Sequence, residues 1–194
     1  MVCKETNLLG IVLNPEIRAL APVANADSRE FPGGLVSVVK DMIGTMYQHR
    51  GIGLAAPQVG LSIPLFVCEL ETPEGLRPRA FWDPSFEPAT ATLIESQEGC
   101  LSLPGAFIPV ARYETIVFQA REILAEPPPD GLFISVKETL TGRNAAVVQH
   151  EIDHLNGILM IDHLKPLQRQ MVLKKLNRRK SADLVRNHAG GDGI

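Results

Sequence analysis

Apolar residues recur at intervals of three and four along parts of the 194-residue chain, a spacing that predicts amphipathic helices. Residues 35–49 form the clearest such stretch, and two glycines, Gly51 and Gly53, follow its end. Residues 164–180 show the same spacing and predict a basic C-terminal helix. A third helix is expected from about Arg143, after the break at Thr141–Gly142, with its end at Gly157.

Short runs of strand-forming residues lie between these helices. They predict strands at 62–70, 115–123, 132–140 and the first part of 93–104. "TPEGLRP" (72–78) and "EPPPDG" (126–131) are typical of turn-rich connections, and residues 21–34 are typical of an exposed loop. Helices and strands do not alternate regularly, so we expect an α+β fold in which mixed or antiparallel sheets pack around a central helix, with a C-terminal helix.

The length and composition fit one globular domain. Hydrophobic residues make up 45% of the chain and charged residues 21%, a normal balance for such a domain. We expect a single domain over residues 1–194, with a core at about 15–164, a C-terminal helix at 165–185 and a disordered tail at 186–194. A monomer is expected.

Charge and hydropathy exclude several partners. The formal net charge of -3 gives no general reason for nucleic-acid binding, so no DNA partner is expected. We expect no secretory signal at the N-terminus. We also expect no membrane span, because no apolar run approaches the roughly 20 residues that a spanning helix needs. The cysteines are Cys3, Cys68 and Cys100, a sparse and odd set that argues for a reducing compartment and a cytoplasmic protein.

The stretch "QHEIDHLNG" (149–157) carries the first candidate chemistry. His150 and His154 lie four residues apart, so on a helix both can face one metal ion, and Glu151 lies beside them as a candidate base. A catalytic metal site commonly has a third protein ligand. Asp162, His163 and His188 follow downstream, but none is convincing as that ligand, and we interpret His163 as a surface or capping residue.

An upstream cysteine supplies a better third ligand. Cys100 follows Gly99, which lets the backbone approach another group closely. One thiolate and two imidazoles leave an open fourth position for water. Cys68 and Cys3 are interpreted as a buried small residue and a residue near a frayed end.

The glycine-rich stretch "GIGLAA" (51–56) matches the dinucleotide-binding fingerprint, but its context excludes that reading. The fingerprint needs a strand before and a helix after it, and here the predicted order is reversed. Gln58 follows, and its amide is either an oxyanion donor or a buried structural group.

Three stretches together resemble the signature motifs of the peptide deformylases, in the order of that family. They are "GIGLAAPQVG" (51–60), "EGCLSLP" (98–104) and "QHEIDHLNG" (149–157). The resemblance covers about residues 15–164. It implies one divalent metal bound by Cys100, His150 and His154. The family metal is typically Fe²⁺, with Zn²⁺, Ni²⁺ or Co²⁺ able to replace it, and the sequence does not choose among them.

The resemblance also implies an activity, the removal of the formyl group from N-formylmethionyl nascent peptides as formate. Glu151 would be the general acid and base, while Gln58 and the backbone N–H of Leu101 would stabilise the oxyanion. The backbone of Ile52, Gly53 and Gly99 would bind the substrate as an added strand.

Several residues near the three motifs have two possible roles each. Asp153 is expected to orient an arginine or a histidine, and Arg112 is a candidate partner or else a solvated charge. Val148 and Ile152 are candidates to line an apolar methionine pocket or to pack in the core. The basic residues after Leu164 suit contact with ribosomal RNA, or simply form a solvated helix face.

Two other classes of protein remain as alternatives. A zinc metalloprotease of the H-E-x-x-H type predicts a third ligand downstream, which the sequence does not supply. A non-enzymatic metal-binding or peptide-binding module leaves Glu151 and Gln58 without a role.

Overall fold

The computed structural model of the protein describes residues 34–124 and 132–176. Several predictions fall outside these residues: the loop before Gly34, the whole connection "EPPPDG", and the chain beyond residue 176 with its tail. Cys3 and His188 lie outside them as well. Within the described ranges, no helix has the length and hydropathy that a membrane span requires.

The strands form two antiparallel sheets, so the expected α+β class is confirmed. The larger sheet has the order β1-β2-β3-β6-β7 and the smaller one pairs β4 with β5. The strands of the larger sheet are β1 (Gly53–Ala55), β2 (Leu65–Thr72), β3 (Gly75–Pro88), β6 (Thr115–Ile123) and β7 (Phe133–Thr141). The hairpin consists of β4 (Leu93–Gly99) and β5 (Phe107–Tyr113).

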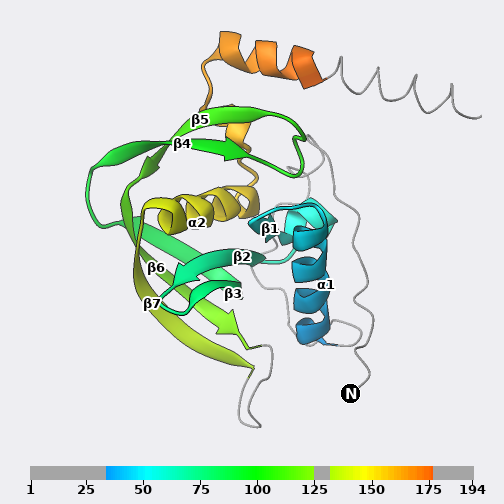
Figure 1. The fold of residues 1–194 in the computed structure, drawn as a ribbon, viewed down its shortest axis with the longest axis vertical. Coiled ribbons are helices and arrows are strands. Elements are labelled where there is room, and N and C mark those ends of the chain that lie inside the picture. The colour runs from blue at the N-terminus through cyan, green and yellow to red at the C-terminus, as the bar shows by residue number, and fades with distance from the viewer. Residues whose placement is uncertain (1–33, 125–131, 177–194) are drawn as a thin grey trace, which may run out of the picture.

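The helix α2 (Gly142–Leu155) lies between the two sheets and contacts strands of both (Figure 1). The helix α1 (Leu35–Gln48) packs against β1 and β2. Two short 3-10 helices are also present. The helix η3 (Ala56–Val59) follows β1, and η4 (Met160–His163) follows α2. Residues 166–176 are helical, in agreement with the predicted C-terminal helix over the part that is described.

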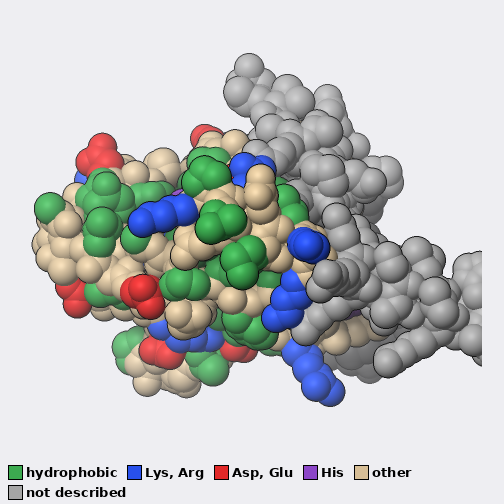
Figure 2. All heavy atoms as spheres, turned by 90° about the horizontal axis from the view of Figure 1, so that it is seen from above, with side chains coloured by type: hydrophobic (Ala, Val, Ile, Leu, Met, Phe, Trp, Pro, Cys, Tyr) green, Lys and Arg blue, Asp and Glu red, His purple; other side chains and the backbone are tan. Residues whose placement is uncertain are grey.

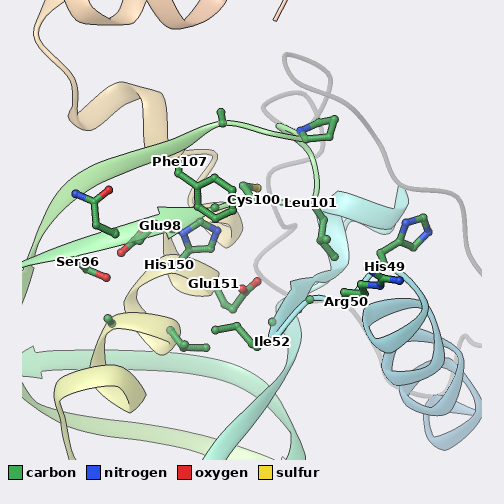
Figure 3. Close-up of a pocket in the computed structure, with 18 of the residues that line it drawn as sticks. His49, Arg50, Ile52, Ser96, Glu98, Cys100, Leu101, Phe107, His150 and Glu151 are labelled. Atoms are coloured by element: carbon green, nitrogen blue, oxygen red, sulfur yellow. Dashed lines mark hydrogen bonds and ion pairs between the residues drawn. The ribbon is translucent and has the colours of Figure 1, made fainter. Parts of the chain in front are cut away.

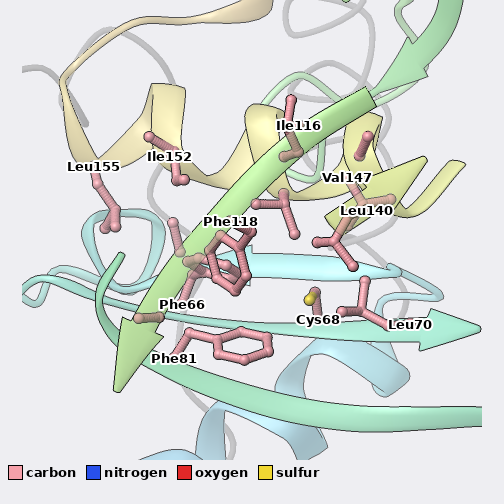
Figure 4. Close-up of a cluster of buried hydrophobic side chains, with 14 residues drawn as sticks. Phe66, Cys68, Leu70, Phe81, Ile116, Phe118, Leu140, Val147, Ile152 and Leu155 are labelled. Carbon is pink, nitrogen blue, oxygen red and sulfur yellow. The ribbon is translucent and has the colours of Figure 1, made fainter. Parts of the chain in front are cut away.

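The core divides at β2, which is buried on both faces. Phe66, Cys68 and Leu70 face α2, whereas Leu65 and Val67 face α1, as the alternation of a strand requires. This explains why "PLFVC" is a continuous apolar run rather than an alternating one. On the α2 side three phenylalanine rings stack with centroids 4.9–6.3 Å apart: Phe66, Phe81 and Phe118 (Figure 4).

A third cluster lies beneath the β4–β5 hairpin. Ile108 and Val110 of β5 pack there against Leu159 and Ile161 from the segment that includes η4. The C-terminal helix adds its half-buried apolar residues Val172, Leu173 and Leu176. The helix is therefore attached to the part of the domain that carries the hairpin.

The predicted strand 115–123 is found with the same bounds, and 62–70 is shifted to Leu65–Thr72. The prediction of a loop at 72–78 was wrong. Only Pro73 and Glu74 lie between β2 and β3, and Pro78 pairs opposite Glu69 in the ladder. The strands β1 and β5 were not predicted; β1 gives little signal because it is three residues long and begins at a glycine.

Candidate metal centre and active site

Cys100, His150 and His154 meet in one buried cluster, with their ligand atoms all within 4.8 Å of one another. The helix α2 presents the two histidines four residues apart, and their Nε2 atoms lie 3.1 Å from each other. Cys100 directly follows β4, and its Sγ lies 3.2 Å from Nε2 of His154. Packing of the hairpin against α2 thus brings Cys100 close to two histidines that lie 50 and 54 positions later in the sequence.

This donor set fits a divalent cation. One thiolate and two imidazoles around a tetrahedral ion are separated by roughly 3.4–3.6 Å, given ordinary metal–ligand bond lengths. The observed separations of 3.1 and 3.2 Å are close to that spacing. Burial and the neighbouring His150 hold the pKa of His154 well below its usual value, so this imidazole is neutral and available as a ligand.

A chain of charged groups supports His150 from behind. The Nδ1 of His150 lies 2.8 Å from Oε2 of Glu98, on the ring edge opposite the cluster. Arg112 donates to both carboxylate oxygens of Glu98, at 2.7 and 2.9 Å, and to Asp153 at 2.6 Å. Burial alone would raise the pKa of Glu98, but its bonds to Arg112 and His150 outweigh it and lower the pKa to about 2. Glu98 is therefore an anion that fixes the orientation of the ring.

The carboxyl group of Glu151 lies in the same cavity. Its side chain is buried, and its Oε2 makes no hydrogen bond to any described residue. Burial raises the pKa of Glu151 to about 7. A carboxyl with such a pKa can both accept and donate a proton near neutral pH.

Gly53 is required for this placement of Glu151. A Cβ at Gly53 would lie 2.1 Å from Oε1 of Glu151, far closer than a non-bonded carbon and oxygen can approach, so the carboxylate would have to move. The glycine of β1 therefore leaves the space that the carboxylate fills, and the glycine-rich stretch has a steric explanation that does not involve a nucleotide.

Gln58 is held with its amide nitrogen toward the cluster. Its Oε1 accepts a hydrogen bond from the backbone N–H of Ala55 at 2.8 Å, which fixes the orientation of the amide. Its Nε2 lies 3.5 Å from Sγ of Cys100 and 3.2 Å from Oγ of Ser102. The side chain is 1% exposed, so its NH₂ group is a pre-oriented donor at the edge of the site.

These groups surround a cavity of about 710 Å³ (Figure 3). Cys100, His150 and Glu151 line it together with Gln58 and residues of β1 and β4. All the residues predicted to bind substrate or oxyanion line the same cavity: Ile52, Gly53, Gly99 and Leu101. Phe107, whose ring packs over Gly99 and is 76% exposed, stands at its mouth.

The structure decides between alternatives that the sequence left open for several residues near the site. Arg112 is buried in the charged chain rather than solvated, and Asp153 contacts both Arg112 and His163. Val148 and Ile152 pack in the core, and Val147 lines the cavity instead. The helical period predicts this difference. Val147 precedes His150 by three residues and lies on the same face of the helix, whereas Val148 precedes it by two and lies on the opposite face.

Glu98 and Arg143 had no role in the sequence reading. From the sequence, Glu98 was noted only as part of the motif "EGCLSLP", and Arg143 only as the expected first residue of a helix. Glu98 meets His150 across 52 positions and Arg143 meets Glu71 across 72, so neither contact has a local signal in the sequence.

A buried thiol and two imidazoles, a protonatable carboxyl and an oriented amide in one open cavity define a metal-dependent hydrolase. The model of the polypeptide deformylase family matches residues 20–170. A peptide deformylase of Pseudomonas aeruginosa is 36% identical over 166 residues, which cover 85% of this chain and 90% of that protein. One of Thermotoga neapolitana is 37% identical over 147 residues, with coverages of 76% and 82%.

Solved structures agree with these relatives. The crystal structure of a peptide deformylase from Legionella pneumophila aligns with a TM-score of 0.73 at 33% identity, over 91% of this chain and 98% of that one. A peptide deformylase of Ehrlichia chaffeensis in complex with actinonin aligns with the same TM-score at 27% identity, over 89% and 98%. The chain belongs to the polypeptide deformylase family. It is a metal-dependent hydrolase that removes N-terminal formyl groups in protein processing.

Proposed function

We propose that Cys100, His150 and His154 hold the metal of this deformylase and that Glu151 moves the protons of the reaction. The observation that carries the proposal is the shared cavity, which the buried Glu151 lines together with Cys100 and His150, two of the three clustered ligand residues. A divalent cation held by the three residues supplies a Lewis acid that acidifies water and polarises the formyl oxygen.

The residues of the chain then divide the chemistry. Glu151 accepts the proton of the attacking water and returns it to the nitrogen of the leaving amine. The amide NH₂ of Gln58 and the backbone N–H of Leu101 donate to the oxyanion that forms at the formyl carbon. Removing one such donor is expected to cost about 3 kcal/mol of transition-state stabilisation.

The peptide is proposed to bind as an extended strand between two sheet edges. β1 is the terminal strand of the five-stranded sheet, and β4 belongs to the separate hairpin. Ile52, Gly53 and Gly99 line the cavity between these edges and offer backbone donors and acceptors. The substrate class is the formylmethionyl end of a nascent polypeptide.

The metal is proposed to be Fe²⁺, as in the resemblance described above, with Zn²⁺, Ni²⁺ or Co²⁺ as replacements. The ligand thiolate has to stay reduced, so we place the protein in the cytoplasm. We further propose a monomer in which the single domain acts alone. Size-exclusion chromatography with light scattering tests the oligomeric state.

The deciding experiment is formate release from formyl-Met-Ala-Ser by protein purified anaerobically with Fe²⁺, with acetyl-Met-Ala-Ser as the control. Release from the formyl peptide alone supports the proposal. A protein that carries one metal ion per chain and releases no formate contradicts it. Comparison of the Fe²⁺, Zn²⁺, Ni²⁺ and Co²⁺ forms then ranks the metals by kcat/KM.

A contact with the ribosome through the C-terminal helix is a second proposal. Val172, Leu173 and Leu176 attach this helix to the domain, which leaves Lys174 and Lys175 exposed. Figure 2 looks onto this side of the molecule, where Lys and Arg side chains lie among hydrophobic ones. Charges of this kind suit the phosphates of ribosomal RNA.

Charge reversal tests this contact without truncating the domain. Lys174→Glu together with Lys175→Glu is expected to weaken salt-sensitive co-sedimentation with ribosomes, while formate release from a short peptide stays unchanged. Lys137→Glu, an exposed lysine on β7, is the matched control. Equal co-sedimentation of all forms contradicts the contact.

A further inference from the structure

Three residues of α2 line the cavity on the N-terminal side of the first metal-binding histidine. Arg143, Ala146 and Val147 precede His150 by seven, four and three residues, so they lie on one face of the helix with it. At 1.5 Å per residue, Arg143 is about 10 Å from His150 along the helix axis. A methionine side chain that extends along this face from a peptide at the metal therefore runs past Val147 toward Arg143.

The wall opposite this face of α2 also carries a polar residue. Ser96 lines the cavity from β4, two positions before Glu98 and thus on the same face of the strand. Glu98 contacts His150, so Ser96 lies one further step along the strand from the metal ligands. The cavity is therefore apolar beside Ala146 and Val147 and polar at Ser96 and Arg143. A pocket built only for a thioether needs no such polar groups.

The guanidinium of Arg143 is only weakly engaged. Its Nη1 makes no hydrogen bond to any residue that the structure describes, although this atom is buried. The acidic oxygen at Glu71 lies 3.7 Å away, beyond hydrogen-bonding distance, on a side chain that is 63% exposed. Because Glu71 is largely exposed and the separation is long, this ion pair contributes little free energy, and a ligand atom can compete with Glu71 for the cation.

The backbone near Arg143 is nevertheless fixed. Asn144 donates to the carbonyl oxygen of Glu71 at 2.9 Å and accepts from its N–H at 3.0 Å. These two bonds tie the first turn of α2 to the end of β2. The backbone that carries Arg143 is thus fixed beside the cavity, while Nη1 of its guanidinium has no hydrogen-bond partner among the described residues.

We propose that Arg143 is a specificity-determining residue, which lets this deformylase accept a first side chain that ends in a hydrogen-bond acceptor. This inference rests on the proposed function of the site. Methionine sulfoxide is the acceptor-bearing side chain that formylmethionine itself gives on oxidation. Its oxygen loses hydration on entering the cavity, and a donor from Arg143 offsets that cost.

The test compares kcat/KM for three peptides that differ only in the first side chain. Formyl-methionine sulfoxide-Ala-Ser carries the acceptor, formyl-Met-Ala-Ser is the parent, and formyl-norleucine-Ala-Ser has the same length without sulfur. Arg143→Leu is expected to lower the ratio of sulfoxide to norleucine by about tenfold, as the loss of a charge-assisted hydrogen bond implies. Arg143→Lys retains a cation and is expected to keep most of that ratio.

Two further variants sharpen the result. Glu71→Gln removes the competing carboxylate and is expected to raise the sulfoxide ratio. Arg77→Leu, an exposed arginine on β3 away from the cavity wall, is the matched control and should leave the ratio unchanged. Melting temperatures of all variants verify that each protein is folded.

The outcomes separate this inference from the proposed function. An equal sulfoxide-to-norleucine ratio in the parent, Arg143→Leu and Arg143→Lys proteins, with formyl-Met still hydrolysed, overturns the role of Arg143 alone. Absence of formate from every peptide with metal bound overturns the assignment of the active site instead. A ratio that falls with Arg143→Leu and rises with Glu71→Gln supports the inference.

Discussion

Oε2 of Glu98 lies 2.8 Å from Nδ1 of His150, so a carboxylate from the hairpin orients a ring that α2 supplies to the candidate metal-binding cluster of Cys100, His150 and His154. The same glutamate is held by Arg112, whose guanidinium is 4% exposed. The position of one proposed metal ligand, His150, thus depends on a charge pair whose two members lie in different strands of the hairpin, β4 and β5.

Glu98→Gln is expected to weaken metal binding by about 10- to 100-fold, because the ring loses its charged partner and Arg112 loses a bidentate one. Competition with a chelator of known affinity measures this change. Glu95→Gln, on the opposite face of the same strand, is the control. Equal metal affinity in both variants would show that the ring keeps its orientation without Glu98.

Glu151→Gln is expected to keep the metal and to lower kcat by about 10²- to 10⁴-fold, because the amide accepts no proton from water. Metal content per chain and formate release are measured on the same sample. Cys100→Ser is the contrasting variant, which should lose metal and activity together. The proton-transfer role would be refuted by a Glu151→Gln protein that releases formate at the parent rate.

Gly53→Ala is expected to lower kcat strongly while the protein still folds and binds metal. The added methyl group would occupy the position of the Glu151 carboxylate, with distances of 2.1 Å to Oε1 and 2.7 Å to Cδ. Gly75→Ala, at a turn with φ +109 and open space around it, serves as a control for backbone strain. It should lower the melting temperature and leave kcat unchanged; a Gly53→Ala enzyme of normal kcat would contradict the steric role of Gly53.

The pair of Arg79 and Glu138 predicts a pH dependence of stability. A hydrogen bond from Arg79 lowers the pKa of Glu138 below its usual 4.5 in the folded protein, although burial opposes this. The stabilisation is therefore present above about pH 4.5 and is lost as the pH falls through the folded pKa.

Glu138→Gln removes this dependence. The variant should lower the free energy of unfolding at pH 7 by about 0.5–1 kcal/mol, since the side chain is a third exposed. The difference from the parent protein is expected to shrink as the pH falls below about 4.5 and through the lowered pKa of Glu138. Urea titrations from pH 3 to 7 measure it, and a difference that stays constant across this range would exclude the pair as its source.

The sequence predicted those parts of the fold in which a local pattern and the packing agree. The helix α1 follows its apolar period, and β6 is an alternating strand with the predicted bounds. The "TPEGLRP" segment failed because its two prolines and glycine outweighed the pairing partners. Eight consecutive pairs join β2 to β3 from Thr72–Gly75 onward, and this ladder is invisible in a window of seven residues.

The clustering of Cys100, His150 and His154 could be predicted because a motif specifies these residues and their spacing, whereas the groups around them could not be predicted. His150 and His154 carry a fixed spacing that a helix explains. The partners of Glu98 and Arg143 come from other strands, and their roles depend on how the hairpin and β2 lie against α2. That Val147 rather than Val148 lines the cavity could have been predicted from the sequence, because helical spacing places Val147 on the same face as His150.

The cavity is bordered by two sheet edges, β1 and β4, that have no strand between them. A formylated peptide that pairs with both would join the two sheets into one, in the order β7-β6-β3-β2-β1-peptide-β4-β5. Only a chain end that is fully stretched over its first residues can enter such a gap. An N-terminus that is already helical or buried in a folded domain cannot bind in this way. With the peptide bound in this proposed way, the reaction would have to take place between synthesis of the chain end and its folding.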